Sequence, residues 1–170
     1  MNGSAHPQEP AATPVVLRTA DLYDEHGEAL DSCDTRFRQF GAVHVFSGVV
    51  ATVQVHDENF LVKEAVAEPG QGRVLVVDGG GSCHSALLGD NMARQARDNG
   101  WAGLIVHGAV RDAEELGSIA IGLKAVGTNP RRSHKVGTGR RDVPVGFGGA
   151  TFRPGDVVVS DEDGIVVIRQ

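Results

Sequence analysis

The sequence has 170 residues, a formal net charge of −6 and 41% hydrophobic residues. This length suggests one domain, because domains usually contain about 100–200 residues. The negative charge argues against a general nucleic-acid coat, and no apolar run approaches the roughly 20 residues of a membrane span. We therefore expect neither direct nucleic-acid binding nor membrane insertion.

The amino-terminal segment, MNGSAHPQEPAAT, has neither the basic start nor the apolar stretch of a signal peptide. Residues 1–14 are polar and rich in Pro and Ala, which predicts a disordered tail before a single domain over residues 15–170. With only two cysteines, Cys33 and Cys83, a disulfide scaffold is excluded and a cytoplasmic location is expected. The sequence contains no CxxC or HxxxH spacing, so we expect no structural zinc site.

The first predicted element is a helix from Thr19 to about Leu30. Thr19 can cap this helix, because a threonine side chain accepts a hydrogen bond from the free backbone N–H groups of the first turn. Leu22, Tyr23 and Leu30 would supply the apolar contacts of the helix.

Two strands are expected next, over residues 42–46 and 49–56, with a break at Ser47-Gly48. Four valines in the second segment favour a strand. A short helix that ends near Ala67 follows these strands.

Residues 73–78 (RVLVVD) are almost wholly apolar, which is typical of a strand buried on both faces. A glycine turn ends this strand, and a helix over residues 90–99 and a second buried strand over residues 102–107 follow it. Residues 73–108 are therefore predicted to form a strand–helix–strand unit.

The remainder of the sequence is predicted to be mostly strand. Two candidates are residues 119–126 and 143–147, and a hairpin is expected around Asp161-Glu162-Asp163-Gly164. Arg131–Arg141 is a loop rich in Arg, Lys and Gly, which we expect to be solvated. Taken together, the predicted elements form a mixed α/β domain with about eight strands and three helices.

The glycine turn Gly79-Gly80-Gly81 resembles a dinucleotide-binding turn only weakly. The third glycine of GxGxxG is absent, and the next strand ends at His107-Gly108 where an acidic residue would be needed. A tight turn that brings backbones together explains these residues better than nucleotide or methyl-donor binding.

Asp90 and the pair Arg111-Asp112 are the candidate catalytic and ligand-binding residues. Asp90 opens the predicted helix, and twenty residues later Arg111-Asp112 follows the buried strand. A helix start and the carboxyl end of a parallel strand lie at the same edge of a sheet, where ligands bind in open α/β folds. The spacing therefore predicts that the three side chains meet.

Their chemistry is complementary. The backbone N–H groups of Asn91 and Met92 at the helix start suit an anion, and Arg111 can hold a carboxylate in a bidentate manner. Asp112 and Asp90 are hard oxygen ligands for Mg²⁺ or Mn²⁺. Together these groups would bind a 2-keto acid. The alternative is that Asp90 only caps the helix and that Arg111-Asp112 is an ordinary surface ion pair.

Several motifs in order resemble the RraA-like family, which comprises the regulator of ribonuclease activity A and the 4-hydroxy-4-methyl-2-oxoglutarate aldolases. They are VLVVDGGGS, ALLGDNMA, NGWAGLIVHGAVRD, IGLKAVGTNPRRS, VGFGGATFRPGD and DEDGIVV. The likeness extends from about Thr19 to Ile168. It implies an α/β fold, a single-domain β/β/α sandwich of the swivelling-domain type, assembled as a homotrimer.

The aldolase signature of this family, Asp followed after twenty residues by Arg-Asp, matches Asp90 and Arg111-Asp112. By this resemblance, Gly89–Met92 binds substrate through backbone amides and Arg111 binds the keto acid and stabilises the enolate. Asp112 ligates the divalent metal, Asp90 orients its waters, and Glu115 lies outside them as a supporting carboxylate.

The resemblance implies a metal-dependent class II aldolase, a carbon–carbon lyase that cleaves 4-hydroxy-4-methyl-2-oxoglutarate into two pyruvates. Oxaloacetate decarboxylation is the expected side activity, because it passes through the same enolate. The segment from Gly89 to Asp112 contains no lysine, which argues against a Schiff-base mechanism.

The alternative within the family is a regulator that inhibits a ribonuclease by protein–protein contact. Some family aldolases also receive a carboxylate from a long C-terminal extension of a neighbouring subunit. Since this sequence ends at Gln170, soon after its last predicted strand, we expect that carboxylate to be missing.

Overall fold

The structure is a computed structural model that describes residues 15–170, so the predicted disordered tail lies outside the described residues. The helices are α1 (Thr19–His26), the 3-10 turn η1 (Gly27–Ala29), α2 (Phe60–Ala67), α3 (Asp90–Asp98) and α4 (Ala113–Leu116). The strands are β1 (Asp31–Ser32), β2 (Arg38–Gln39), β3 (Phe46–Gln54), β4 (Val74–Asp78), β5 (Ala86–Leu88), β6 (Gly103–Val110), β7 (Gly122–Thr128), β8 (Arg140–Arg141), β9 (Val145–Phe147), β10 (Ala150–Phe152), β11 (Val157–Ser160) and β12 (Ile165–Ile168).

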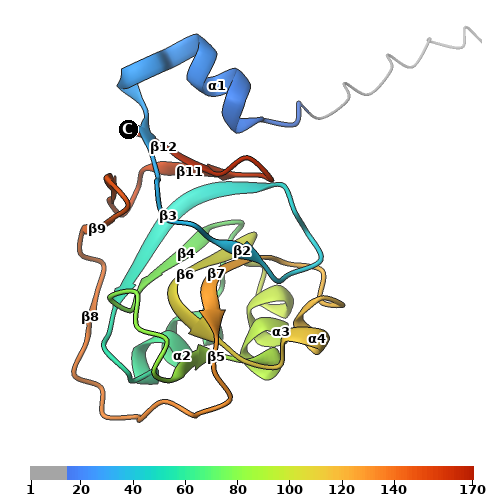
Figure 1. Ribbon diagram of the computed structural model, residues 1–170, viewed down its shortest axis with the longest axis vertical. Helices are drawn as coiled ribbons and strands as arrows, with labels where there is room; N and C mark the ends of the chain where they lie inside the picture. The colour runs from blue at the N-terminus through green and yellow to red at the C-terminus, as the bar shows by residue number, and fades with distance from the viewer. Residues whose placement is uncertain (1–14) are drawn as a thin grey trace, which may run out of the picture.

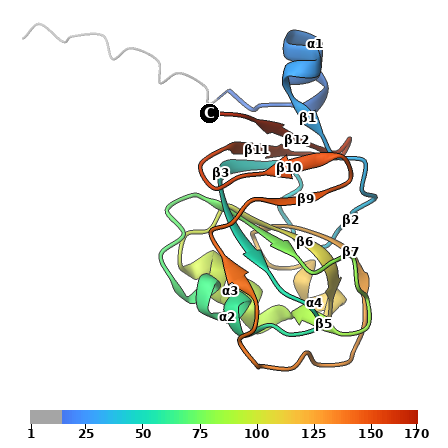
Figure 2. The ribbon, with the colours of Figure 1, turned by 90° about the vertical axis from the view of Figure 1, so that its left-hand side faces the viewer.

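The main sheet has the strand order β1-β12-β11-β3-β4-β6-β7-β2, with β5 beside β6 and β8 beside β3. Strands β3, β4, β6 and β7 run parallel, and the helices α2, α3 and α4 lie in the connections between them. The predicted strand–helix–strand unit is confirmed as β4, α3 and β6. In both views these three helices lie together at one end of the molecule, and α1 lies at the opposite end near β11 and β12 (Figures 1 and 2).

Each face of the parallel sheet has its own hydrophobic core. In β4, Leu75 and Val77 belong to the core shared with helices α2 and α3, whereas Val74 and Val76 belong to the core shared with β9 to β12. Side chains alternate between the two faces of a strand, so the first four residues of β4 must all be apolar. This arrangement confirms the predicted mixed α/β fold with a sheet and flanking helices. Among residues 15–170, none of the helices has the length and apolar character that a membrane crossing requires.

The prediction of two strands over residues 42–46 and 49–56 is wrong, because β3 continues through Ser47-Gly48. Both residues pair with β11, while the later part of β3 pairs with β4. A Cβ atom at Gly48 would lie 2.4 Å from the carbonyl oxygen of Gly72. This glycine therefore allows the backbones to approach closely and does not mark a turn.

The prediction that Thr19 caps the first helix is also wrong. Arg18 occupies the N-cap position, and the Thr19 hydroxyl donates a 2.7 Å hydrogen bond to Asp161 in the turn between β11 and β12. Leu22 is buried as expected, but Tyr23 is exposed and its hydroxyl donates to Glu28. The helix is thus positioned by a hydrogen bond to a turn that is distant in sequence.

Other predicted boundaries shift without changing the order of elements. The strand predicted to end at residue 107 continues to Val110, because β5 adds a partner beside its last residues. The strand predicted from residue 119 begins at Gly122, and Ile119 is buried in the preceding turn. Within residues 15–170 the structure has twelve strands in place of the predicted eight, because several pairings involve only two or three residues. The hairpin of β11 and β12 is confirmed.

Asp78, at the carboxyl end of β4, is one of several nearly buried carboxylates. Asp78 lies 3.2 Å from the His107 ring, and its pKa is lowered below the ordinary value by this hydrogen bond and by one from the N–H of Gly80. A lowered folded-state pKa contributes stability above the unfolded-state pKa, and that stability is lost as the pH falls through the folded-state pKa.

We therefore expect Asp78→Asn to lose less stability in acid than the wild type. The measurement is the urea-derived free energy of unfolding at about pH 7 and about pH 3, on either side of an ordinary Asp pKa. The control is Asp24→Asn, at an exposed position in α1, which should follow the wild-type pH dependence. The same acid sensitivity in Asp78→Asn and wild type would contradict this prediction.

Candidate active site at the carboxyl edge of the parallel sheet

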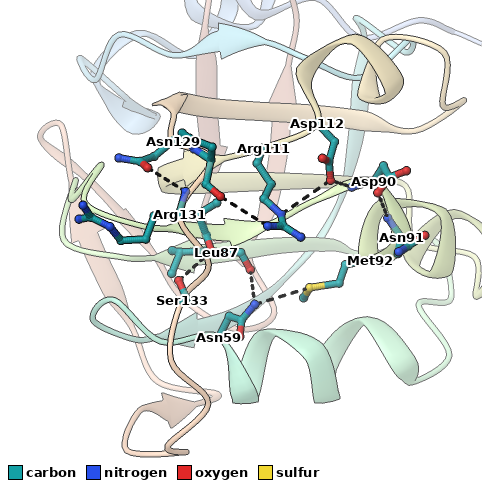
Figure 3. A network of polar contacts seen from close by, with 12 residues as sticks. Asn59, Leu87, Asp90, Asn91, Met92, Arg111, Asp112, Asn129, Arg131 and Ser133 are labelled. Carbon is teal, nitrogen blue, oxygen red and sulfur yellow. Dashed lines mark hydrogen bonds and ion pairs between the residues drawn. The ribbon is translucent and has the colours of Figure 1, made fainter.

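The structure brings Asp90 and Arg111-Asp112 together at the carboxyl edge of the parallel sheet, as their spacing predicts (Figure 3). Strand β5 makes this meeting possible. The N–H of Arg111 donates a 3.0 Å hydrogen bond to the carbonyl oxygen of Leu88, the last residue of β5. The start of α3 is therefore held beside the end of β6.

Asp112 has a left-handed backbone, with φ 61° and ψ 44°, and occupies the N-cap position of α4. Its Oδ2 atom accepts a 3.2 Å hydrogen bond from the N–H of Asp90. A Cβ atom at Gly89 would lie 2.5 Å from the same oxygen. Glycine at position 89 therefore leaves room for the carboxylate against the start of α3.

Asp90 is an ionised carboxylate within a small network. Arg94, one helical turn later, donates a hydrogen bond to Asp90, and this bond lowers the pKa of Asp90 below the ordinary value. The N–H of Asn91 donates a 2.8 Å hydrogen bond to Asp90 Oδ1. The backbone N–H of Asn91, which was predicted to face an anion, therefore donates its hydrogen bond to Asp90 in this structure.

Arg111 lies between Asp112 and the chain that follows β7. Its Nε atom is 3.9 Å from Asp112 Oδ2, and its Nη1 atom donates a 3.4 Å hydrogen bond to the carbonyl oxygen of Pro130 (Figure 3). About a third of each side chain is exposed, with values of 32% for Arg111 and 34% for Asp112. The guanidinium and the carboxylate are therefore both accessible to a ligand.

A cavity of about 270 Å³ is lined by every predicted site residue from Gly89 to Met92, and by Arg111 and Asp112. A second cavity of about 320 Å³ lies against Arg111 and Asp112 from the side of Asn129 and Pro130. Glu115, the predicted supporting carboxylate, is exposed on α4 and lines neither cavity. The site residues thus share one hollow, but Glu115 does not join them.

Sequence reasoning missed five polar or charged residues of the same cavity. They come from the start of α2 and from the basic loop: Asn59, Lys63, Arg132, Ser133 and Lys135. The charge of the loop was visible in the sequence, but its distance from Asp90 along the chain gave no signal that it would form a wall of the cavity.

The basic loop is exposed over most of its length, as expected for a solvated loop, but its main chain is anchored to the body of the protein. The carboxylate of Glu58, only 2% exposed, accepts hydrogen bonds from the N–H groups of Val136 and Gly137 at 3.3 and 3.0 Å. Ser133 donates a 2.7 Å hydrogen bond to the carbonyl oxygen of Ala86 in β5. These bonds hold the loop at the cavity.

The donor set suits a hard divalent cation that keeps most of its water. Among residues 15–170 no group of three His, Cys, Asp or Glu residues could enclose an ion. Mg²⁺ commonly binds through one or two carboxylates, with water and substrate completing its shell. The partly exposed Asp112, held in place by the N–H of Asp90, fits that mode of binding.

The glycine turn after β4 is a tight turn. The N–H groups of Gly79 and Gly81 both donate to the carbonyl oxygen of His107, and the N–H of Gly80 donates to Asp78. Since these amides are used inside the chain, the turn does not present them to a nucleotide phosphate. The His107 ring is stacked on the ring of Phe147, with 4.3 Å between the ring centroids, and Phe147 belongs to the core shared with β9 to β12.

The family model described as RraA-like: Aldolase/RraA matches residues 19–167. The chain belongs to the RraA-like family. This family includes aldolases and inhibitors of ribonuclease, so membership alone leaves both activities open.

Several solved structures are similar to this RraA-like chain, and three of them show the range of names in the family. A Geobacillus kaustophilus protein named S-adenosylmethionine:2-dimethylmenaquinone methyltransferase is 46% identical, with a TM-score of 0.89 and coverage of 91% of this chain and 96% of that chain. The RNA-processing inhibitor RraA from Thermus thermophilis is 45% identical, with a TM-score of 0.87 and coverage of 89% and 92%. Streptomyces coelicolor RraAS2, named as an unusual member of the RNase ES inhibitor RraA family, is 29% identical, with a TM-score of 0.71 and coverage of 88% and 77%.

The left-handed backbone of Asp112 yields a stability prediction. Asparagine tolerates this conformation, so Asp112→Asn should change the free energy of unfolding by no more than about 0.5 kcal/mol. Valine is branched at Cβ, and Asp112→Val should lower that free energy by about 2 kcal/mol. Denaturant unfolding measures both values.

The matched control is Asp98→Val at the exposed end of α3, which should cost less than about 1 kcal/mol because the backbone there is helical. Equal losses for the Asn and Val variants at position 112 would show that the left-handed backbone does not limit this position.

Proposed function

We propose that this protein is a divalent-metal-dependent class II aldolase that cleaves 4-hydroxy-4-methyl-2-oxoglutarate into two pyruvates. One observation carries the proposal: Asp90, Arg111 and Asp112, the residues of the aldolase signature, meet at one cavity at the carboxyl edge of the parallel sheet. A ligand site is expected at that edge of an open α/β sheet.

Arg111 and the start of α3 would bind the carboxylate next to the keto group. The guanidinium matches a carboxylate in a bidentate manner, and the helix start adds backbone N–H groups and the positive end of the helix dipole. Within the predicted segment Gly89–Met92, the N–H groups of Asp90 and Asn91 already donate to Asp112 and Asp90, so the main-chain donors would be those of Gly89 and Met92. Arg111 is accessible for the contact. The substrate would therefore be oriented with its keto group toward the two aspartates.

The reaction breaks the bond between C3 and C4 of the substrate. The electron pair of this bond forms the enolate of the first pyruvate, and the C4 hydroxyl loses its proton as C4 becomes the keto carbon of the second pyruvate. Arg111 would stabilise the negative charge on the enolate oxygen. Protonation of the enolate at C3 completes the balance.

Asp112 is the residue that would hold Mg²⁺ or Mn²⁺, and Asp90 would orient water molecules of that ion. The bound ion would supply Lewis-acid polarisation of the keto group. The chain itself keeps Asp112 in position through the N–H of Asp90, and the hydrogen bond from Arg94 favours the charged form of Asp90.

Oxaloacetate decarboxylation is proposed as a side activity of the same site. When oxaloacetate loses CO₂, the electron pair of the broken bond forms the same pyruvate enolate, so Arg111 would stabilise the same charge.

Two lysines, Lys63 and Lys135, line the cavity, although the segment from Gly89 to Asp112 contains no lysine. Both lysines are exposed at the rim, and the proposed roles do not require a Schiff base.

A second candidate function is inhibition of a ribonuclease through protein–protein contact. The observation that favours it is the 45% identity with a protein named as an RNA-processing inhibitor. Such a regulator does not need the metal-binding carboxylate. In either role we propose a cytoplasmic homotrimer.

The decisive experiment measures pyruvate release from 4-hydroxy-4-methyl-2-oxoglutarate and from oxaloacetate, with Mg²⁺ or Mn²⁺ and with EDTA. Turnover should require the added metal. Asp112→Asn and Arg111→Met should each lower kcat/KM by about 100-fold or more, because each removes a charge that acts on the reacting oxygens.

Arg97→Met is the matched control, because Arg97 is an exposed arginine of α3 that pairs with Asp98 outside the cavity. It should keep wild-type turnover. Absence of pyruvate release by the wild type with either substrate would overturn the proposal. Inhibition of a ribonuclease by the same inactive preparation would then support the regulator.

Gly89→Ala tests the placement of Asp112 separately from its charge. The new methyl group would displace the carboxylate, since the side chain can move more easily than the backbone. We expect kcat/KM to fall at least about tenfold while the free energy of unfolding changes by less than about 1 kcal/mol.

The control for this variant is Gly146→Ala in β9, where the nearest atom to the added Cβ would be at an ordinary 3.6 Å. It should leave turnover and stability unchanged. Wild-type turnover in Gly89→Ala would show that the Asp112 position in this structure is not the reactive one.

A further inference from the structure

One buried lysine has no part in the proposed aldolase reaction. Lys124, in β7, is only 5% exposed, and it forms no ion pair with any of residues 15–170. Lysine is almost never buried to this extent without a partner of opposite charge, because removing an ammonium group from water is costly. This position therefore favours the neutral amine.

The sheet register explains how Lys124 reaches the interior. Its neighbours Leu123 and Ala125 belong to the core shared with α2 and α3, so Lys124 lies on the opposite face of β7. Across the sheet it pairs with Ile105, which belongs to the core shared with β9 to β12. The lysine thus stands at the end of an apolar row on that face.

Main-chain carbonyl groups of the turn between β11 and β12 hold the amine. The Nζ atom donates hydrogen bonds to the carbonyl oxygens of Asp161 and Gly164, the second at 3.4 Å. A neutral amine has two N–H groups for these bonds and keeps its lone pair. Burial lowers the pKa of Lys124 below the ordinary lysine value, although the nearby carboxylates of Asp161 and Asp163 oppose this effect. More of this amine is therefore uncharged at neutral pH than in an exposed lysine.

Lys124 lines a cavity of about 330 Å³ that shares no residue with the cavity of Asp90 and Arg111. The same turn and the segment after β1 supply the rest of its lining. The other charged side chains of the lining are exposed, and three of the four are carboxylates: Arg36, Asp34, Glu162 and Asp163. An excess of carboxylates repels an anion, so this cavity suits a small uncharged molecule and not a 2-keto acid.

We propose that this cavity is a second site, where Lys124 binds a small uncharged aldehyde covalently as an imine. The amine nitrogen bonds to the carbonyl carbon, and the carbonyl oxygen leaves as water with the two hydrogens of the neutral amine. A proton from solvent then gives the imine one N–H for a turn carbonyl. Desolvation activates lysine amines for this chemistry, and water reverses it by hydrolysis. The site does not depend on the aldolase activity.

The test is labelling of the full chain with propanal at about pH 7, with cyanoborohydride present to fix each imine as a stable amine. The sequence has three lysines, Lys63, Lys124 and Lys135, and peptide mass spectrometry separates them from one another and from the amino-terminal amine. Lys124 should be labelled at least about tenfold faster than Lys63 and Lys135, which are exposed.

The dependence on concentration separates a binding site from simple reactivity. The labelling rate at Lys124 should saturate as propanal is raised, whereas the rate at Lys63 should rise linearly. Glyoxylate, an aldehyde that carries a carboxylate, should label Lys124 at least about fivefold more slowly than propanal, because carboxylates line the cavity.

Two variants control for the fold and for the neighbouring thiol. Lys124→Arg keeps a side chain that can donate to the turn carbonyls but cannot form an imine, so the label at this position should vanish while thermal unfolding shows a folded protein. Cys33→Ser changes a thiol of the same cavity. It should keep the label on Lys124, because cyanoborohydride does not fix an aldehyde adduct of a thiol.

Equal labelling of the three lysines, or a rate at Lys124 that does not saturate, would overturn the second site. Labelling of Lys124 by glyoxylate as fast as by propanal would overturn the assignment of an uncharged ligand. Neither result bears on the aldolase proposal, which fails through absence of pyruvate release.

Discussion

The hydrogen bond from the N–H of Asp90 to the carboxylate of Asp112 joins the two halves of the site. It links the first residue of α3 to the residue after Arg111, and the bond from Arg111 N–H to Leu88 runs beside it. Asp112 can accept this bond because its backbone is left-handed and because Gly89 has no side chain. Without this pair of contacts, the guanidinium and the carboxylates would have no fixed relation to one another.

The sheet beneath this contact is rigid because it is buried on both faces. Helices α2 and α3 cover one face, and the strands β9 to β12 cover the other. A sheet packed on both sides cannot tilt at its carboxyl edge without disturbing one core or the other. The site residues therefore sit on ends of elements whose positions are set by packing, while their own side chains remain partly exposed.

Charge around the cavity is organised in two parts. Asp90 and Asp112 lie with Arg111 at the sheet edge, and the remaining cations lie on α2 and the basic loop. The acidic protein as a whole therefore carries a locally basic wall, which its net charge of −6 does not reveal. This separation of local from overall charge would favour an anionic ligand at the cavity of an otherwise acidic chain.

The sequence by itself determined the mixed α/β class, the β4-α3-β6 unit and the meeting of Asp90 with Arg111-Asp112. These follow from local apolar runs and from the rule that parallel strands end at one edge. Tertiary structure alone decided the course of β3 through Gly48, the bond from Thr19 to Asp161 and the place of the basic loop. Each of these depends on a partner distant in the sequence, and local residue preferences contain no information about that partner.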